Sequence, residues 1–281
     1  MGSASHRRSA VALSIAGSDS GGGAGVQMDL RTMQRLGAFA TTAVAAVTAQ
    51  NLEGVTEVAL TTASLLGAQI DAVLTGFPVA AIKTGMLGSA ALVGVVADRL
   101  RDTAAPLVID PVMVATSGAR LFGDDPTEAY AALWPRAALV TPNLDEAAVL
   151  LGMPAGAAIV RADLDEAANA LAERLQCAVL LKGGHLDGPP RDTLVADGKT
   201  IAWEHDRING ANTHGSGCML SAAITAQLAL GQPLPEACGA ALAFAHDALA
   251  RGAQNGHAGL AAVEVAQADP DHVRVTTPTG S

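Results

Sequence analysis

Short runs rich in β-branched and other apolar residues alternate with longer alanine-rich segments along most of this chain. The predicted strands are 11–16, 40–49, 80–83, 107–109, 137–140 and 178–181, with a hairpin of 192–196 and 200–203 around Asp197-Gly198. The predicted helices are 24–36, 61–75, 89–100, 126–133, 143–151, 163–175, 217–230 and 234–251. Such alternation predicts an α/β fold with a mostly parallel sheet and helices on both of its faces.

The composition supports one large core. Hydrophobic residues make up 50% of the 281 residues, whereas aromatic residues make up only 2%, so small side chains must pack the helices closely against the sheet. The chain has no internal repeat and no linker rich in proline, serine or charge. We therefore expect a single domain over residues 11–265, with flexible ends at 1–10 and 266–281.

Charge and cysteine content exclude several classes of function. The net charge of −10, without a basic stripe, argues against partners such as nucleic acid or an anionic membrane surface. No stretch is long and apolar enough to span a bilayer. The three cysteines, Cys177, Cys218 and Cys238, are widely spaced and odd in number, which predicts free thiols and a cytoplasmic location.

Glycine-rich segments follow several of the predicted strands, where ligands bind in parallel sheets. The first reads AGSDSGGGAGVQMD, residues 16–29, and its glycines allow the backbone to approach a ligand. It is not a Walker A loop, because no Gly-Lys-Ser/Thr follows, and Val26 replaces the last glycine of a dinucleotide-binding loop. The alternative interpretation is a flexible turn that caps a helix.

A second glycine-rich turn, Gly215-Ser216-Gly217-Cys218, opens a predicted helix. The unpaired N–H groups and the dipole of a helix start favour negative charge, and the same field lowers the pKa of a thiol. This segment therefore predicts an anion site with a base or nucleophile beside it, which suits chemistry on a phosphoryl group. The alternative is that Cys218 is a small buried apolar residue.

Polar residues at other strand ends suit a metal and a phosphate. Asp110 follows a strand and can organise Mg²⁺ through water, although an aspartate before proline also starts turns. Asn143 and Glu146 have capping-box spacing, which is a structural role, yet they face the same edge of the sheet. Lys182 precedes two glycines, which suits a nucleotide phosphate as well as a solvated surface.

Two residues are candidates for holding an organic ring. Gln50 ends the second strand, and its amide offers a donor and an acceptor to the edge of a heterocycle. Met86 lies between glycines and suits one wall of an apolar pocket. A surface amide and a core methionine are the corresponding structural alternatives.

Taken in order, AGSDSGGGAGVQMD, TAQN, KTGMLG, IDPVM, TPNLDEA, LKGGH and NTHGSGC resemble the motifs of hydroxymethylpyrimidine/phosphomethylpyrimidine kinases of thiamine biosynthesis, in the ribokinase-like superfamily. The resemblance runs from about residue 11 to residue 250. It implies a three-layer sandwich with a mostly parallel central sheet, a homodimer, and the use of ATP and Mg²⁺. The implied reaction phosphorylates 4-amino-5-hydroxymethyl-2-methylpyrimidine and then its monophosphate, giving the diphosphate.

The resemblance also implies a role for each matching residue. The aminopyrimidine alcohol is bound by Gly17, Ala24, Asp29, Gln50, Met86 and Val112; Mg²⁺ and its waters lie near Asp110, Asn143 and Glu146; Lys182 contacts the ATP phosphates; and Gly215, Ser216, Gly217 and Cys218 form the anion hole. Many sugar kinases of the superfamily have an aspartate as general base where Cys218 stands. We therefore hypothesise that Cys218 accepts the proton of the substrate.

Departures from the family pattern are small, and two other functions are alternatives. Ser216 stands where the family usually has threonine, and Met28 stands where the family often has alanine. The larger side chain of Met28 leaves the size of the substrate pocket open. A pyridoxal or pyridoxine kinase is the nearest alternative, although Cys218 in place of aspartate argues mildly against a dedicated one. A catalytically idle binding protein would lack Lys182, the acidic residues or Gly217, and all of these are present.

Overall fold

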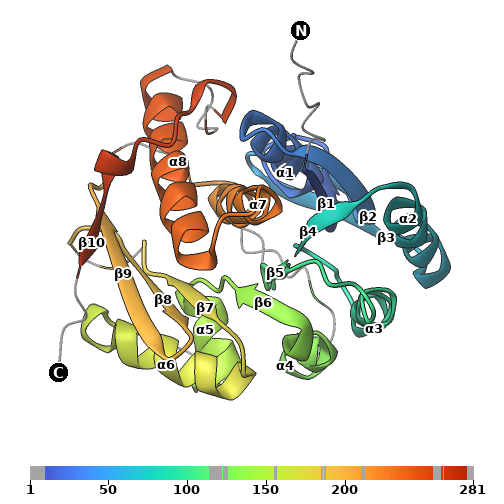
Figure 1. Cartoon of the computed structure of the whole chain (residues 1–281), viewed down its shortest axis with the longest axis horizontal. Coiled ribbons are helices and arrows are strands. Elements are labelled where there is room, and N and C mark those ends of the chain that lie inside the picture. The colour runs from blue at the N-terminus through green and yellow to red at the C-terminus, as the bar shows by residue number, and fades with distance from the viewer. Residues whose placement is uncertain are drawn as a thin grey trace, which may run out of the picture.

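The central feature of the computed structural model is a sheet of ten strands in the order β10-β9-β8-β7-β6-β5-β4-β1-β2-β3 (Figure 1). The structure describes residues 10–113, 122, 126–154, 157–184, 186, 188–209, 213–255, 261 and 263–276. The strands are β1 (Val11–Asp19), β2 (Phe39–Asn51), β3 (Gly54–Leu60), β4 (Val79–Thr84), β5 (Leu107–Ile109), β6 (Ala137–Val140), β7 (Val179–Lys182), β8 (Arg191–Ala196), β9 (Lys199–His205) and β10 (Val273–Thr276).

The middle of the sheet is parallel and both ends are antiparallel. Strands β2, β1, β4, β5, β6 and β7 pair in parallel, whereas β3 at one end and β8, β9 and β10 at the other pair antiparallel. The carboxyl ends of β1, β2, β4, β5 and β7 therefore meet along one edge of the sheet. The predicted α/β class with a mostly parallel sheet is confirmed.

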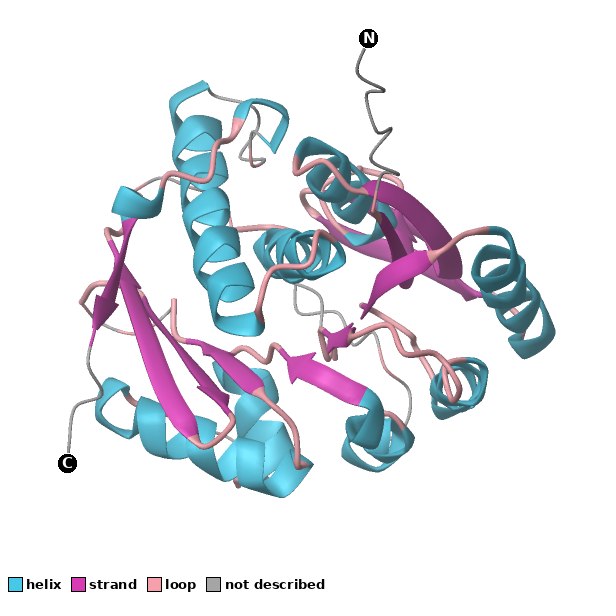
Figure 2. Ribbon diagram, viewed as in Figure 1, coloured by secondary structure: helices cyan, strands magenta, loops and turns pink. Residues whose placement is uncertain are grey.

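Helices cover both faces of the sheet (Figures 1 and 2). One face carries α1 (Gly25–Arg35), α7 (Ser216–Ala229) and α8 (Leu234–Asn255), and the other carries α2 (Ala63–Gly76), α3 (Ala90–Arg99), α4 (Pro126–Ala129), α5 (Leu144–Leu151) and α6 (Leu164–Leu175). Short 3₁₀ turns are η1 (Tyr130–Ala132), η2 (Trp134–Arg136), η3 (Arg161–Asp163), η4 (Val263–Val265) and η5 (Pro270–His272). Separate apolar clusters fill the space on each side of the sheet, which makes three layers.

Small side chains let the helices approach the sheet. Helix α7 buries an unbroken run from Met219 to Ala226, which holds three alanines, one serine and one threonine beside methionine, leucine and isoleucine, against the strands and against α8. The side chains on this helix are apolar or small all round, as expected for a helix enclosed between other elements. The low aromatic content thus fits the structure, because small side chains let the central helix α7 pack closely against its neighbours.

Two strands differ from the sequence prediction. The prediction has no element at Gly54–Leu60, where the structure has β3, whose side chains are exposed over most of its length. Within the segment 266–281, which was expected as a flexible end, the structure has η5 and β10 over residues 270–276, and β10 pairs with β9. The predicted hairpin is confirmed, with Asp197 and Gly198 at φ values of 50° and 71° in the turn between β8 and β9.

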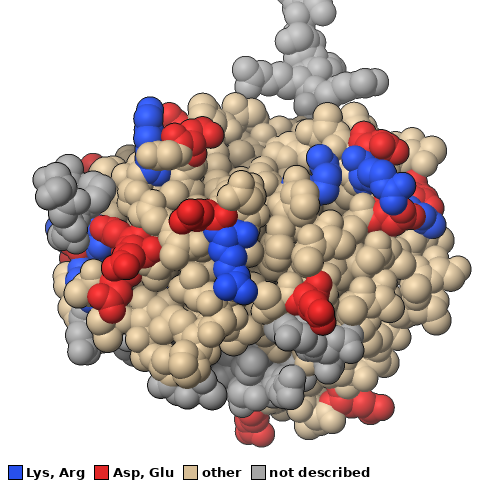
Figure 3. Space-filling view, turned by 90° about the horizontal axis from the view of Figure 1, so that it is seen from below, with Lys and Arg blue, Asp and Glu red and all other residues tan. Residues whose placement is uncertain are grey.

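Some predicted features lie outside the described residues. These are the ends at 1–9 and 277–281, Asn212 of the NTHGSGC motif and His185 of the LKGGH motif. No described helix is long and apolar enough to cross a membrane. On the face shown in Figure 3, the Lys and Arg side chains outside the grey segments are few and scattered, and several lie next to acidic ones.

Candidate active site

A cavity of about 670 Å³ opens along the edge where the parallel strands end. Thirteen of the fourteen predicted site residues line it, and Asp29 is the exception: Gly17, Ala24, Gln50, Met86, Asp110, Val112, Asn143, Glu146, Lys182, Gly215, Ser216, Gly217 and Cys218. They come from segments spread over some two hundred residues of sequence. The parallel topology is what brings them together, because each follows a strand at the same edge.

The start of helix α7 forms the floor of this cavity. Gly215 precedes the helix with φ 73° and ψ 2°, and no side chain caps the helix start. A Cβ atom at Gly215 would collide with the Gly23 carbonyl oxygen, so glycine is required for both conformation and space. The N–H groups of Gly217 and Cys218 belong to the first turn, where a helix has no internal acceptors. This is the geometry of an anion site.

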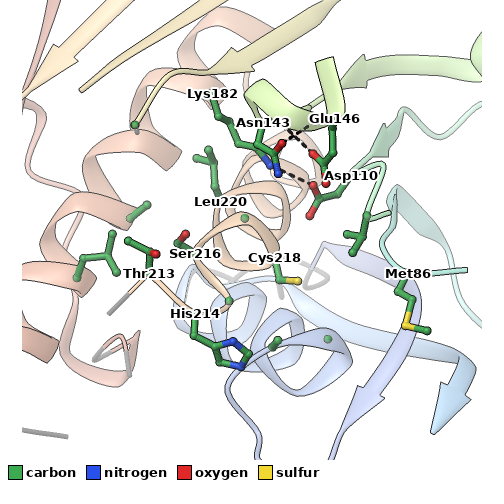
Figure 4. A pocket seen from close by; sticks show the side chains of 18 of the residues that line it. Met86, Asp110, Asn143, Glu146, Lys182, Thr213, His214, Ser216, Cys218 and Leu220 are labelled. Atoms are coloured by element: carbon green, nitrogen blue, oxygen red, sulfur yellow. Dashed lines mark hydrogen bonds and ion pairs between the residues drawn. The ribbon is translucent and has the colours of Figure 1, made fainter. Parts of the chain in front are cut away.

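Opposite the helix start, Asp110 and Lys182 form an ion pair. Lys182 Nζ lies 3.2 Å from Asp110 Oδ1 (Figure 4). Ser221 Oγ donates to Asp110 Oδ2 at 3.1 Å. Although burial acts to lower the pKa of Lys182, the carboxylates of Asp110 and Glu146 raise it above its usual value. Lys182 therefore stays charged beside the cavity.

Gly217 leaves room for this lysine. A Cβ atom at position 217 would lie 3.3 Å from Lys182 Nζ and 3.8 Å from Asp110 Oδ2. The first distance is shorter than an ordinary van der Waals contact, so a side chain there would push the ammonium away from the helix start. The glycine thus allows Lys182 and the helix N–H groups to face the same anion.

Glu146 and Asn143 begin helix α5 and face the same wall. Asn143 Oδ1 accepts from the Glu146 N–H at 2.8 Å, and Glu146 Oε2 accepts from the Asn143 N–H at 2.8 Å, which completes a capping box (Figure 4). Burial raises the pKa of Glu146 to about 7, with a further rise from Asp110, and Lys182 opposes it. The capping role of these two residues is therefore confirmed, and both residues also line the cavity.

This wall has the donors that Mg²⁺ takes when it keeps most of its water. Asp110 and Glu146 supply two carboxylates, and such sites commonly use one or two carboxylates together with substrate phosphates. No group of three or more His, Cys, Asp or Glu side chains among the described residues is arranged to hold a metal ion by itself. The residues thus fit Mg²⁺ held through water and phosphate, and do not fit a closed protein cage.

The other end of the cavity is shaped by the ends of β1, β2 and β4. Met86 is almost completely buried and faces Gly17, and Val112 lies on the loop after β5. The side chain of Gln50 accepts from Thr48 Oγ1 at 3.2 Å, and its backbone N–H donates to Ser20 Oγ at 2.8 Å. One amide set among apolar and glycine surfaces is suited to a small flat ring.

Asp29 corrects one prediction, because it does not line the cavity. Its side chain is fully buried in α1, where it accepts from Lys83 Nζ at 2.7 and 2.8 Å and from Ser14 Oγ. Burial raises the pKa of Asp29, and hydrogen bonds from Lys83 and Ser14 oppose that rise. Asp29 is the last residue of the AGSDSGGGAGVQMD motif and lies one turn into α1. At that position its side chain points into the core and away from the cavity.

Cys218 corrects a second prediction, which concerns its pKa. The helix start was expected to lower the pKa of the thiol, but burial raises it to about 11. Lys83 and the Gly25 N–H act to lower the pKa, whereas Asp29 and Asp110 act to raise it further. Cys218 faces the space between Asp110 and Met86 in Figure 4, so its position in the cavity is as predicted while its ionisation is not.

Several cavity residues are missing from the sequence prediction. Asp19 belongs to the first glycine-rich segment and His214 directly precedes the second, and the place of Asp19 within the AGSDSGGGAGVQMD motif was the available signal for it. Ser221 does not line the cavity but donates to Asp110, and it lies one helical turn beyond Gly217, so helical periodicity from the anion-hole turn indicates it. Residues at the far end, among them Leu242 and His246, come from α8 and carry no motif.

Comparisons with known proteins agree on one family. Residues 19–262 match the family model described as phosphomethylpyrimidine kinase. A hydroxymethylpyrimidine/phosphomethylpyrimidine kinase of Rhizobium meliloti is 46% identical over 242 residues, which are 85% of this chain and 90% of that protein. The thiamine biosynthesis bifunctional protein ThiED of Geobacter sulfurreducens is 40% identical over 228 residues, 80% of this chain and 46% of that protein.

A solved structure supports the same fold. The pyridoxal kinase of Staphylococcus aureus in complex with AMP-PCP and pyridoxal superposes with a TM-score of 0.82 at 31% sequence identity. The superposition covers 96% of this chain and 99% of that one. The predicted ribokinase-like three-layer architecture therefore agrees with a vitamin kinase solved with both a nucleotide and an alcohol bound.

Proposed function

This chain belongs to the phosphomethylpyrimidine kinase family, and on that premise we propose that it transfers the terminal phosphoryl group of ATP to 4-amino-5-hydroxymethyl-2-methylpyrimidine. The monophosphate formed is then phosphorylated again, which yields the diphosphate for thiamine biosynthesis. The observation that carries this proposal is a single cavity with a ring-sized end at Gln50 and Met86 and an anion site at Gly217 and Lys182.

The ring end supports binding of the pyrimidine. The amide of Gln50 bonds the polar edge of the ring, while Met86 and Val112 pack against its faces. Gly17 and Ala24 let the first glycine-rich segment approach closely. This arrangement directs the hydroxymethyl group towards the start of α7.

The anion end supports phosphoryl transfer by positioning and charge. The transferred group carries negative charge over several oxygens, and a kinase mainly has to orient it and neutralise that charge. The N–H groups of Gly217 and Cys218, together with the Lys182 ammonium, do this from two sides. Ser216 adds a hydroxyl at the helix start. We assign Cys218 to the anion hole through its N–H group, because a thiol with a pKa near 11 is thiolate in about one molecule in ten thousand at pH 7.

Mg²⁺ completes the proposed nucleotide site. Asp110 and Glu146 would hold it through its waters, and Asn143 fixes the orientation of Glu146 by the capping box. When bound, the ion neutralises charge on the ATP phosphates.

A pyridoxal-type vitamin kinase is the second candidate, favoured by the likeness to the Staphylococcus aureus enzyme. ATP consumption measured in parallel with the aminopyrimidine alcohol, pyridoxal and a thiazole alcohol separates the two. We expect the aminopyrimidine alcohol to give the highest kcat/KM. A higher value for pyridoxal favours the second candidate, and turnover of none of them favours a binding protein.

The Gln50→Ala variant is the control for the ring end. It should raise the KM for the pyrimidine by about tenfold, the value of one or two lost hydrogen bonds, and leave the KM for ATP nearly unchanged. An equal rise in both KM values would argue against a contact between Gln50 and the ring.

We also propose that the protein is a cytoplasmic homodimer. Strand β3 is the last strand of the sheet on this side and most of its side chains are exposed. Val47 on β2 and Val58 and Leu60 on β3 are 55%, 39% and 44% exposed. An exposed apolar ribbon with an unpaired edge favours association with a second copy. Light scattering should give twice the mass of one chain, and Val47→Glu should shift it towards the monomer.

A further inference from the structure

The two glycine-rich segments of the cavity are joined by a side-chain bridge outside the assigned site residues. Asp19, at the end of β1, belongs to the first segment, and His214 precedes the anion hole. His214 Nε2 lies 3.6 Å from Asp19 Oδ2, and both side chains are largely buried, with 14% and 3% exposed. We call this pair the Asp19–His214 latch.

Asp19 holds its own segment in shape. Its Oδ1 accepts from the Gly21 N–H at 2.8 Å, and its Oδ2 accepts from the N–H groups of Gly23 and Ala24 at 2.9 and 2.8 Å. These amides are therefore already occupied by a carboxylate of the protein. It follows that this glycine-rich segment is a rigid wall of the cavity, and that the phosphate-binding role falls to the start of α7.

The backbones of the two segments touch at the same place. The space beside Gly215 is filled by the Gly23 carbonyl oxygen, so no side chain fits between them. The latch thus acts next to a direct backbone contact. Although burial acts to raise the pKa of Asp19, the nearby His214 and the hydrogen bonds from the N–H groups of Gly21 and Ala24 hold it below its usual value, so the carboxylate stays charged.

We propose that His214 is a positioning residue that, through Asp19, fixes the anion hole relative to the pyrimidine end of the cavity. The inference rests on the proposed function. Phosphoryl transfer needs the attacking oxygen about 3 to 3.5 Å from the phosphorus, and a misplacement of about 1 Å costs on the order of a hundredfold in rate. The latch joins the segment that contacts the ring to the segment that holds the phosphoryl group.

The test is a double-mutant cycle of His214→Ala and Asp19→Asn in the full chain, read as kcat and KM for both substrates. We expect each single variant to lower kcat by about 30-fold, with both KM values changed less than about threefold. The double variant should lose no more than about threefold beyond the worse single variant, because the two side chains act as one unit.

Two further variants separate positioning from other roles. His214→Gln keeps a donor near the position of Nε2 but cannot act as a base, so it should restore at least about a third of the wild-type kcat. His272 and Asp269 form a similar pair at 3.9 Å in a part of the chain that does not line the cavity. His272→Ala is therefore the matched control, with kcat expected to stay at the wild-type value.

Several results would overturn the latch. Multiplying losses in the double variant would show independent roles, and equal losses in His214→Ala and His214→Gln would show proton transfer by His214 itself. A raised pyrimidine KM at constant kcat would show a direct ring contact. If Asp19→Asn does not fold, the His214→Ala and His214→Gln pair decides. The proposed function is tested separately, by turnover of the aminopyrimidine alcohol with the wild-type protein. If the wild-type protein turns over only pyridoxal, the ratios of kcat and KM between variant and wild type are measured with pyridoxal instead.

Discussion

Residue 218 shows how burial can outweigh a helix dipole. The dipole and the N–H groups of a helix start favour a thiolate by about a kilocalorie per mole at exposed positions. Removal of the thiol from water opposes this, and here it raises the pKa to about 11. Sequence identifies the helix start but not the depth of the side chain, so the position of Cys218 was predictable and its ionisation was not.

This pKa has a direct chemical consequence. Iodoacetamide should modify Cys218 at pH 7.5 on the order of a hundredfold more slowly than free cysteine, because only the thiolate reacts. The rate should rise about tenfold per pH unit up to about pH 10. Peptide mass spectrometry measures it, with the urea-unfolded chain as control. A rate equal to that of free cysteine, which levels off above about pH 9, would contradict the burial argument.

The same argument predicts a mild effect of removing the thiol. A general base contributes about 10² to 10⁴ in rate, whereas the N–H group of residue 218 is kept in any variant. Cys218→Ala should therefore retain kcat within about tenfold of wild type. A loss of more than about a hundredfold would return the role of proton acceptor to the thiol.

Gly217 offers a second prediction at this scale. Gly217→Ala brings a methyl group to 3.3 Å from Lys182 Nζ and should lower kcat/KM by about a hundredfold, comparable to losing one anion-hole donor. Gly94→Ala in α3 meets no atom within 4 Å and is the control, expected to gain up to about 1 kcal/mol in stability at unchanged activity. Similar activity in the two variants would contradict the proposed place of Lys182.

At the scale of elements, periodicity predicted the enclosed strands and failed at the edges. The boundaries of β5 and β6 agree with the prediction, because their apolar runs are short and fully enclosed by helices. Strand β3 lies at the edge of the sheet and most of its side chains, apolar ones included, are exposed, so no buried face marks it in the sequence. Strand β10 follows a polar stretch and is held by β9, a contact between residues about seventy positions apart.

One buried ion pair fastens α1 to β4. The side chains of Lys83 and Asp29 are both fully buried. Burial acts to lower the pKa of Lys83, but the Asp29 carboxylate outweighs this and raises the pKa. Lys83→Met leaves a buried carboxylate without its partner and should destabilise the fold by about 3 to 5 kcal/mol in urea unfolding. The double variant Lys83→Met/Asp29→Asn should recover most of that loss. Equal destabilisation in the two variants would argue that the pair is not coupled.

At the scale of the whole molecule, the residues that line the cavity were predictable because the topology of the sheet brings them together. Parallel strands direct their carboxyl ends to one edge, so motifs at successive strand ends belong to one cavity even when Gly17 and Cys218 lie two hundred residues apart. Side-chain contacts between different elements could not be predicted from the sequence in this way. The Asp19–His214 pair and the direction of Asp29 depend on how α1 and α7 pack against the sheet, which single motifs do not encode.

The most direct test of the central claim follows the phosphorus itself. With wild-type protein, ATP, Mg²⁺ and the aminopyrimidine alcohol, ³¹P NMR should show the pyrimidine monophosphate first and its diphosphate later, with ADP formed in step with both. This result is predicted because one anion site serves the alcohol and the monophosphate in turn. ATP hydrolysis to free phosphate without a phosphorylated pyrimidine, under conditions where the protein binds both substrates, would contradict it.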